Sequence, residues 1–435
     1  MLYLKNILSK NKNFDNLLFL LISSIIFITA GDFIEDYIRL IFLKILIIFL
    51  ISLKINFVKE AKLIIKKNKI IIILLISFII SITISFITSP SKIHLFAFQW
   101  LRIRYLDTIT DIFLFIFLYL YFKDRNINYN NLVRSIVIPG LIFSIFIIYT
   151  FVSNKGISNT NKEIIFFDGT RMVSMLATFL IAFFLGFLHS TLKKNNSQNL
   201  FILTTFMTLG ILLMGRGTIF AILTTYLFMC IILLINKRKF RDEFIIIIVS
   251  ICLSILITKI IFHISASVEY VSKHQHNFDL DFRNKDHFIY YLDRLNLWKY
   301  GYFISLENPY FGKGPGGFAI TAYNDFHANK SYGDLIINKY FTHNHPHNFI
   351  IQFLIEWGTV GTLLIFTLLI KLCISSLKYF FKFKKYNLLI PGLSIIGLTS
   401  HGLIDGTLFH ATFTFYFVLS LSVLCSEISN KTNFK

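Results

Sequence analysis

Long apolar runs recur along the whole chain and constrain its fold more than any other feature. Residues 70–87, 219–235 and 244–257 contain no charged side chain. A helix needs about 20 predominantly apolar residues to cross a hydrocarbon core about 30 Å thick. In that core only helices or a closed barrel satisfy the backbone, and a barrel would show short alternating segments. Because these runs are long and continuous, the sequence predicts an all-α, polytopic membrane protein.

The composition and the charge support this class. Of the 435 residues, 55% are hydrophobic and 15% are charged, whereas soluble domains carry about 25% charged residues. The formal net charge of +20 would favour nucleic acid as a partner if the protein were soluble. Here the basic residues stand in short clusters between apolar runs, as in the orienting loops of membrane proteins. We therefore expect membrane lipid as a partner and no nucleic acid.

The apolar runs predict about twelve transmembrane helices. They cover roughly residues 16–31, 37–53, 69–88, 105–122, 132–152, 173–191, 199–214, 218–236, 243–263, 348–372, 387–401 and 407–425. A separate amphipathic helix is expected at roughly 93–103, lying in the membrane interface. Lysine and arginine residues concentrate in every second gap, for example at 59–69, 237–241 and 378–385. Because cytoplasmic loops carry the excess of these residues, both termini are expected in the cytoplasm.

The pattern divides the chain into three parts. Residues 1–263 hold the first nine predicted spans, and residues 347–435 hold the last three. Between them, residues 264–346 form a long loop on the outer side, with equal numbers of acidic and basic residues. Apolar residues at helical spacing over 288–306 predict a helix in this loop, and the glycine- and proline-rich stretch 309–317 predicts a rigid turn. Loops of this length in a compact protein are usually functional.

The segment where the loop re-enters the membrane is rich in polar side chains. His343, His345 and His347 alternate along it, and Pro346 fits the first turn of a helix. His347 is therefore expected at the outer mouth of the tenth span. Three alternating histidines on an extended segment lack the ligand spacing of a metal site, so no metal is expected.

A polar stripe continues into the tenth span. Asn348, Gln352, Glu356 and Thr359 recur at helical spacing on an otherwise apolar helix. Intramembrane carboxylates are costly and usually face a cavity or the interior of the bundle, which makes Glu356 a candidate for binding substrate. The alternative is a stripe that only packs helices together, with histidines at the membrane interface.

Three arginines are expected on the same outer side. Arg216 stands between two glycines in a short gap between spans, Arg171 precedes the sixth span, and Arg294 lies in the long loop. Arginine is always charged and favours bidentate contact with phosphate oxygens. The alternatives are a lipid-headgroup anchor for Arg216 and a structural salt bridge, for example with Asp293, for Arg294.

The last outer loop adds His401, Asp405 and His410. By the parity of the spans, these residues face the same side of the membrane as His347 and the three arginines. That convergence favours one functional site over several separate structural roles.

One motif consists of His347-Asn348, nine further residues, and then Gly358-x-x-Gly361-Thr362. It resembles the signature of the bacterial O-antigen ligases, the lipopolysaccharide ligases of the O-antigen ligase/polymerase superfamily. The twelve-span layout, with a long outer loop before the tenth span, is similar as well.

Two arginine motifs extend the resemblance. The run Arg294-x-x-x-Trp298, followed by the glycine-rich stretch 308–318, is similar to the approach to the signature in this superfamily. The run Met214-Gly-Arg216-Gly resembles its short arginine loop, and both motifs are shared with O-antigen polymerases. By motif the resemblance covers roughly residues 165–425.

The resemblance implies an inverting, metal-independent glycosyl transfer, without a cofactor, at the periplasmic face of the bacterial inner membrane. The donor would be a polysaccharide on undecaprenyl pyrophosphate, and the acceptor a hydroxyl group of lipid A–core. His347 would be the general base, since histidine ordinarily titrates near neutral pH, and His345 is its rival. Arg216 and Arg294 would stabilise the departing pyrophosphate. The residues expected to bind substrate are Arg171, His345, Asn348, Glu356, His401 and Asp405.

Three other functions compete with this interpretation. An O-antigen or exopolysaccharide polymerase and a protein O-oligosaccharyltransferase would use the same donor with another acceptor. A transporter or flippase would need binding sites near the midplane, broken helices and internal repeats. The sequence has no clear repeat, and its polar residues cluster at one face. A non-catalytic assembly protein would leave Arg216, Arg294 and His347 without a role.

Overall fold

The computed structural model describes residues 13–27, 34–55, 69–89, 95–123, 129–153, 169–191, 196–212, 216–235, 241–265, 285–328, 345–406, 408 and 410–430. Within these ranges the chain forms helices and no strand, which confirms the all-α prediction. The α-helices are α2 (Asn13–Ser24), α3 (Ile34–Lys54), α5 (Lys69–Thr88), α6 (Leu95–Lys123), α7 (Tyr129–Ser153), α8 (Gly169–Thr191), α9 (Asn196–Leu212), α10 (Arg216–Ile235), α11 (Arg241–Ser265), α13 (Lys285–Glu307), α14 (Gly317–His327), α15 (Phe349–Phe383), α16 (Leu389–Ile404) and α17 (Ala411–Asn430), and a 3-10 helix, η3 (Tyr386–Leu388), separates α15 from α16.

Seven of the described helices are long and apolar enough to cross a membrane, as expected of a multi-pass membrane protein. They are Arg102–Lys123, Tyr129–Thr150, Gly217–Ile235, Asp242–Ile261, Phe349–Phe383, Tyr386–Ile404 and Ala411–Ser429. Shorter apolar helices cover Asp15–Ser24, Ile72–Thr88 and Val173–His189. Each predicted span overlaps one described helix, but the count of twelve spans stays a prediction. The same holds for the division into three parts and the outer position of residues 264–346.

The charged residues of α6 lie inside the bundle. The predicted separate helix at 93–103 is wrong, because its described residues belong to α6, which runs unbroken from Leu95 to Lys123. Arg104 falls in the gap between the predicted segments 93–103 and 105–122, yet it is buried, and its Nη1 lies 3.8 Å from an oxygen of Asp107. Lys44 Nζ of α3 lies 2.7 Å from the other oxygen of Asp107. Since these opposite charges lie together in the interior, the helix continues through residues that usually mark a loop.

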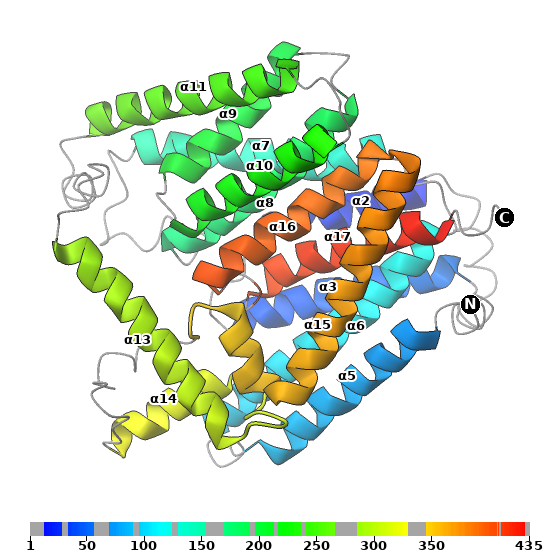
Figure 1. Ribbon diagram of the computed structural model, residues 1–435, viewed down its shortest axis with the longest axis vertical. Coiled ribbons are helices and arrows are strands. Elements are labelled where there is room, and N and C mark those ends of the chain that lie inside the picture. The colour runs from blue at the N-terminus through cyan, green and yellow to red at the C-terminus, as the bar shows by residue number, and fades with distance from the viewer. Residues whose placement is uncertain are drawn as a thin grey trace.

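The helices pack into a bundle, with α13 and α14 at its lower left edge in Figure 1. Inside the bundle α16 packs against α8 and α10, and α17 packs against α6. The segment 264–346 contains both α13 and α14, which confirms that helices lie within it. These two helices pack on the start of α15 through an apolar cluster that includes Tyr300, Phe318 and Ile355. The cluster joins the segment to the rest of the protein.

The helix α15 is broken at Gly358. This residue has φ 64° and ψ −172°, which divides α15 into a short first part and a long second part. The glycine-rich turn supplies hydrogen bonds at the break: Thr359 N donates to Pro309 O at 2.7 Å. On the other side of the break, Lys313 N donates to Ile355 O at 2.7 Å. A Cβ on Gly358 would collide with a backbone carbonyl group of the turn, so a larger residue does not fit.

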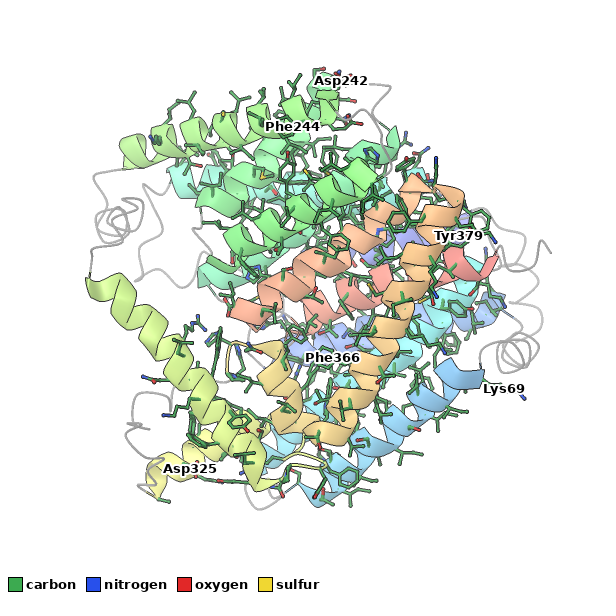
Figure 2. The ribbon with its side chains drawn as sticks, viewed as in Figure 1. Lys69, Asp242, Phe244, Asp325, Phe366 and Tyr379 are labelled. Atoms are coloured by element: carbon green, nitrogen blue, oxygen red, sulfur yellow. The ribbon has the colours of Figure 1, made fainter. Side chains whose placement is uncertain are left out.

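The predicted span at 348–372 lies within α15, which is long and apolar enough to cross a membrane, but the sequence did not predict the break at Gly358. The second part of α15 runs past Phe366 and Tyr379, away from α14 and its Asp325 (Figure 2). Thr359 begins this second part, so the predicted polar stripe ends before the break. The start of α15 and its long second part are thus two separate elements.

The sidedness of the bundle has a direct test. Reporter fusions at Arg238 and Lys384 are expected to be active in the cytoplasm, and fusions at Asn329 in the periplasm, because the basic clusters mark the cytoplasmic loops. Two reporters are fused at each of these positions, one that is active only in the periplasm and one that is active only in the cytoplasm. A cytoplasmic signal at Asn329 would contradict the outer position of residues 264–346 and of the site.

Candidate active site

His347 and Asp405 come together from distant parts of the chain. His347 precedes α15 and Asp405 follows α16, yet His347 Nδ1 lies 2.5 Å from Asp405 Oδ1. The side chain of His347 is 1% exposed and that of Asp405 is 13% exposed. A carboxylate bound to one ring nitrogen fixes the tautomer and makes the other nitrogen the proton acceptor. The pair therefore has the arrangement of a histidine base held by a carboxylate.

The backbone around His347 is held in an uncommon conformation. His347 has φ 54°, in the left-handed region, which costs about 1–3 kcal/mol for a residue other than glycine. The next residue, Asn348, is the N-cap of α15 and accepts hydrogen bonds from two amides of the first turn. Its Nδ2 also donates to Leu403 O at 3.1 Å. Asn348 thus ties the start of α15 to the end of α16, and α15 begins at Phe349, not at Pro346 as predicted.

Two further histidines surround this pair. His345 Nδ1 accepts a hydrogen bond from His347 N at 3.2 Å, and the two rings have centroids 4.1 Å apart. His410, just before α17, presents its ring edge-on to His345 with 5.6 Å between centroids. The structure therefore brings His345, His347, Asp405 and His410 into one cluster.

His345, His347 and Asp405 also have the composition of a metal site. One ligand atom from each lies within 4.8 Å of the other two. Two atoms bound to one zinc ion in a tetrahedron lie roughly 3.3 Å apart. His347 Nδ1 and Asp405 Oδ1 are closer than that, at 2.5 Å. These two atoms are arranged to share a proton, and metal-independent chemistry stays a prediction.

Asp405 is ionised at physiological pH. Burial raises the pKa of its carboxyl group, but the hydrogen bond and charge of His347, together with the charges of Arg294 and His401, lower that pKa more. The pKa of Asp405 therefore lies well below its usual range. A charged Asp405 stabilises the imidazolium ion that forms when His347 takes up a proton.

Arg294, on α13, acts on this cluster through its charge. Its side chain is half-buried, and its positive charge contributes to the lowered pKa of Asp405. One turn later, Leu297 packs in the apolar cluster with Ile351 of α15, so α13 lies against the start of α15. The structure therefore brings a permanent positive charge to the part of the molecule that holds His347.

Three helices converge at His401. Its Nδ1 lies 2.8 Å from Thr178 Oγ1 of α8. Thr218 Oγ1 of α10 donates to Ser174 O of α8 at 3.0 Å. A Cβ on Gly217 would lie 2.6 Å from the ring of His401, so the first turn of α10 packs directly on that ring. These contacts hold the starts of α8 and α10 beside the end of α16.

Arg216 and Arg171 belong to these two helix starts. Arg216 is the first residue of α10, and Arg171 lies in the first turn of α8. The backbone thus places both arginines near the end of α16 that leads to Asp405. Their side chains lie outside the described part of the structure, so their roles in binding stay predictions.

Glu356 lies at the opposite end of the first part of α15 from His347. Its side chain is 1% exposed, and its Oε1 accepts hydrogen bonds from Gly316 N at 2.7 Å and from Gln352 Nε2 at 2.5 Å. Its Oε2 lies 3.9 Å from Arg104 Nη2. These contacts are all with protein groups, and a direct contact of Glu356 with substrate stays a prediction.

The sequence did not single out three charged residues near Arg104, the arginine beside Glu356. Lys44 Nζ lies 2.7 Å from Asp107 Oδ1 and 2.7 Å from Asp111 Oδ1, and all three side chains are buried. A signal was present, because a lysine interrupts the apolar run 37–53 and two aspartates interrupt the run 105–122. Ionisable residues inside spans usually face one another or a functional site.

A family model described as O-antigen ligase matches residues 200–366 of the chain. The matched region runs from α9 into the second part of α15 and includes Arg216, Arg294, His347 and Glu356. No curated protein matches the sequence. The match confirms the resemblance carried by the sequence motifs and supports this chain as a member of the O-antigen ligase/polymerase superfamily.

Proposed function

We propose that this protein joins O-antigen polysaccharide, carried on undecaprenyl pyrophosphate, to a hydroxyl group of lipid A–core at the periplasmic face of the inner membrane. The observation that carries the proposal is the 2.5 Å hydrogen bond between His347 and Asp405, with the charge of Arg294 acting on the same carboxylate. A held base beside a fixed positive charge suits transfer from a pyrophosphate donor to a hydroxyl group. The match to the O-antigen ligase family supports this substrate class.

In the proposed reaction His347 is the general base. Asp405 holds the imidazole with its Nδ1–H toward the carboxylate, so Nε2 takes the proton of the acceptor hydroxyl. The acceptor oxygen attacks the anomeric carbon of the donor sugar while the bond from that carbon to the pyrophosphate oxygen breaks. Undecaprenyl pyrophosphate leaves with the electron pair, and attack opposite the leaving group inverts the anomeric configuration. General-base catalysis of this kind typically contributes about 10²–10⁴-fold.

The proposed role of Arg294 and Arg216 is to stabilise the pyrophosphate as it gains negative charge. A guanidinium group donates two parallel hydrogen bonds to phosphate oxygens, so it supplies positive charge without a divalent ion. The residues proposed to bind the surrounding sugars and phosphates are Arg171, His345, Asn348 and His401. No cofactor takes part in this scheme.

The site suits substrates that both carry lipid anchors. The glycan donor and the acceptor would then meet at the membrane surface. There the reactive groups are carried by the ends of helices, without a separate soluble domain. His347, Asp405 and His410 lie in the segments that join helices, between α14 and α15 and between α16 and α17. This placement supports a reaction at the edge of the bilayer.

Deleting the gene tests the proposal. A cell that lacks the ligase still polymerises O-antigen, so long chains are expected to accumulate on the undecaprenyl carrier, with none on lipid A–core. Electrophoresis of extracted lipopolysaccharide should show only the core band, and the wild-type gene on a plasmid should restore the ladder of long chains.

The same gel separates the ligase from its nearest competitor. Loss of a polymerase leaves lipid A–core carrying a single repeat unit. A core-plus-one-repeat band in the deletion strain would therefore show that the acceptor is another lipid-linked glycan.

A further inference from the structure

The first part of α15, residues 349–357, is held at both ends. At its start, Asn348 bonds to α16 and His347 bonds to Asp405. At its other end, the backbone carbonyl of Glu356 accepts hydrogen bonds from Ser85 Oγ of α5 at 2.5 Å and from Gly314 N at 3.1 Å. The helical segment that begins next to the proposed base is therefore also fixed at its other end, at Glu356.

Glu356 is the only charged residue in 349–357. Its carboxylate is buried and accepts hydrogen bonds from Gly316 N and Gln352 Nε2. A glutamine at position 356 would accept the same two bonds, and burying a charge costs more than burying an amide. These two hydrogen bonds therefore do not explain why a charged residue stands at position 356. The group beside the other carboxylate oxygen is Arg104, whose Nη2 lies 3.9 Å from Oε2.

Arg104 is itself fixed to two helices. Its guanidinium lies over the ring of Tyr37 of α3, 5.4 Å from the centroid, and Nη1 donates to the Tyr37 hydroxyl at 3.5 Å. The same nitrogen lies 3.8 Å from Asp107 of α6. Asp107 in turn pairs with Lys44 of α3. Through Arg104, the carboxylate of Glu356 is therefore attached to the packed pair α3 and α6.

The carboxylate also reaches the turn that follows α13. Gly316 N donates to it, and the turn 308–316 joins α13, which carries Arg294, to α14. A second bond in this region, from Ser89 Oγ to Lys313 O at 2.5 Å, anchors the same turn to the end of α5. Glu356 thus belongs to the helical segment that begins next to His347, and its carboxylate contacts the turn that follows α13, the helix of Arg294.

We propose that Glu356 is a positioning residue, which sets the place of His347 relative to Arg294 without touching substrate. This inference rests on the proposed function, because it assumes that His347 is the base and that Arg294 binds the donor. Loss of the charge at position 356 releases the first part of α15 from Arg104. The base at its start then shifts, and small shifts of a catalytic group lower the rate of the chemical step.

A double-mutant cycle tests this role. Glu356→Gln is expected to lower kcat about tenfold, with KM for the undecaprenyl-pyrophosphate donor changed by less than about twofold, in transfer to lipid A–core by the purified protein. In the His347→Ala background, Glu356→Gln should change the residual rate by less than about twofold, because a residue that acts through the base has no effect once the base is gone. Glu427→Gln, which removes another ion-paired glutamate, in α17 beside Lys385, is the matched control and should leave kcat unchanged.

The outcomes separate the two proposals. A tenfold loss in both backgrounds would mean that Glu356 only supports the fold, and an unchanged kcat for Glu356→Gln would also overturn the positioning role. Full activity of His347→Ala would instead overturn the proposed base. If Glu356→Gln does not accumulate in membranes, Arg104→Gln combined with Glu356→Gln removes both charges, and the same cycle is run with this pair.

Discussion

Replacing His347 with alanine is expected to lower the rate of glycosyl transfer by about 10²–10⁴-fold, the usual contribution of a general base. The protein should remain folded and inserted, because the start of α15 is also held by Asn348, which caps the helix and bonds to Leu403. The rate is measured with purified protein, undecaprenyl-linked polysaccharide and lipid A–core. Size-exclusion chromatography in detergent reports whether the variant keeps its fold.

Two further variants make this result specific. His347 has φ 54°, and asparagine tolerates the left-handed region better than most residues. His347→Asn should therefore be as inactive as His347→Ala while it preserves the backbone. The neighbouring His345 is the control: His345→Ala should lower the rate less. If His345→Ala is inactive and His347→Ala is active, the base has been assigned to the wrong histidine.

The helices of this protein could be predicted from sequence because long apolar runs leave few alternatives in a membrane. Two features could not be. The continuity of α6 depends on Arg104 and Asp107 finding opposite charges on neighbouring elements, including Lys44, which is 63 residues away from Asp107. The break at Gly358 depends on backbone partners from the turn 309–313. Both depend on contacts between segments that local periodicity does not reveal.

The candidate site shows the same limit. The sequence pointed to His347 and Arg294 through motifs and to Asp405 through the last outer loop, as separate residues on one side of the membrane. Their pairing could not be predicted, because His347 and Asp405 are 58 residues apart and meet only through the packing of α15 on α16. The sequence marked Glu356 as an intramembrane carboxylate and a candidate for binding substrate, but its contacts with the turn after α13 and with Arg104 depend on the tertiary fold.

Arg294→Ala is expected to lower the transfer rate by about 10²–10³-fold, the typical cost of losing one preorganised group that stabilises developing negative charge. Arg294→Lys should be impaired less, because lysine keeps the charge but loses the planar fork that binds two phosphate oxygens. The two variants are compared in the same transfer assay. Arg134→Ala, which removes an exposed arginine of α7, is the matched control and should keep the wild-type rate.

A chelator completes this test. By removing divalent ions, it shows whether the arginines alone neutralise the charge of the pyrophosphate. If Arg294 and Arg216 supply the positive charge, transfer by the wild-type protein should continue in EDTA at an unchanged rate. Arg294→Ala should not be rescued by added magnesium or zinc ions, since the proposed scheme has no place for a metal ion. Loss of wild-type activity in EDTA, restored by a divalent ion, would overturn the metal-independent mechanism. His345, His347 and Asp405 would then have to be tested as ligands of that ion, with the hydrogen bond between His347 and Asp405 replaced by bonds to the metal.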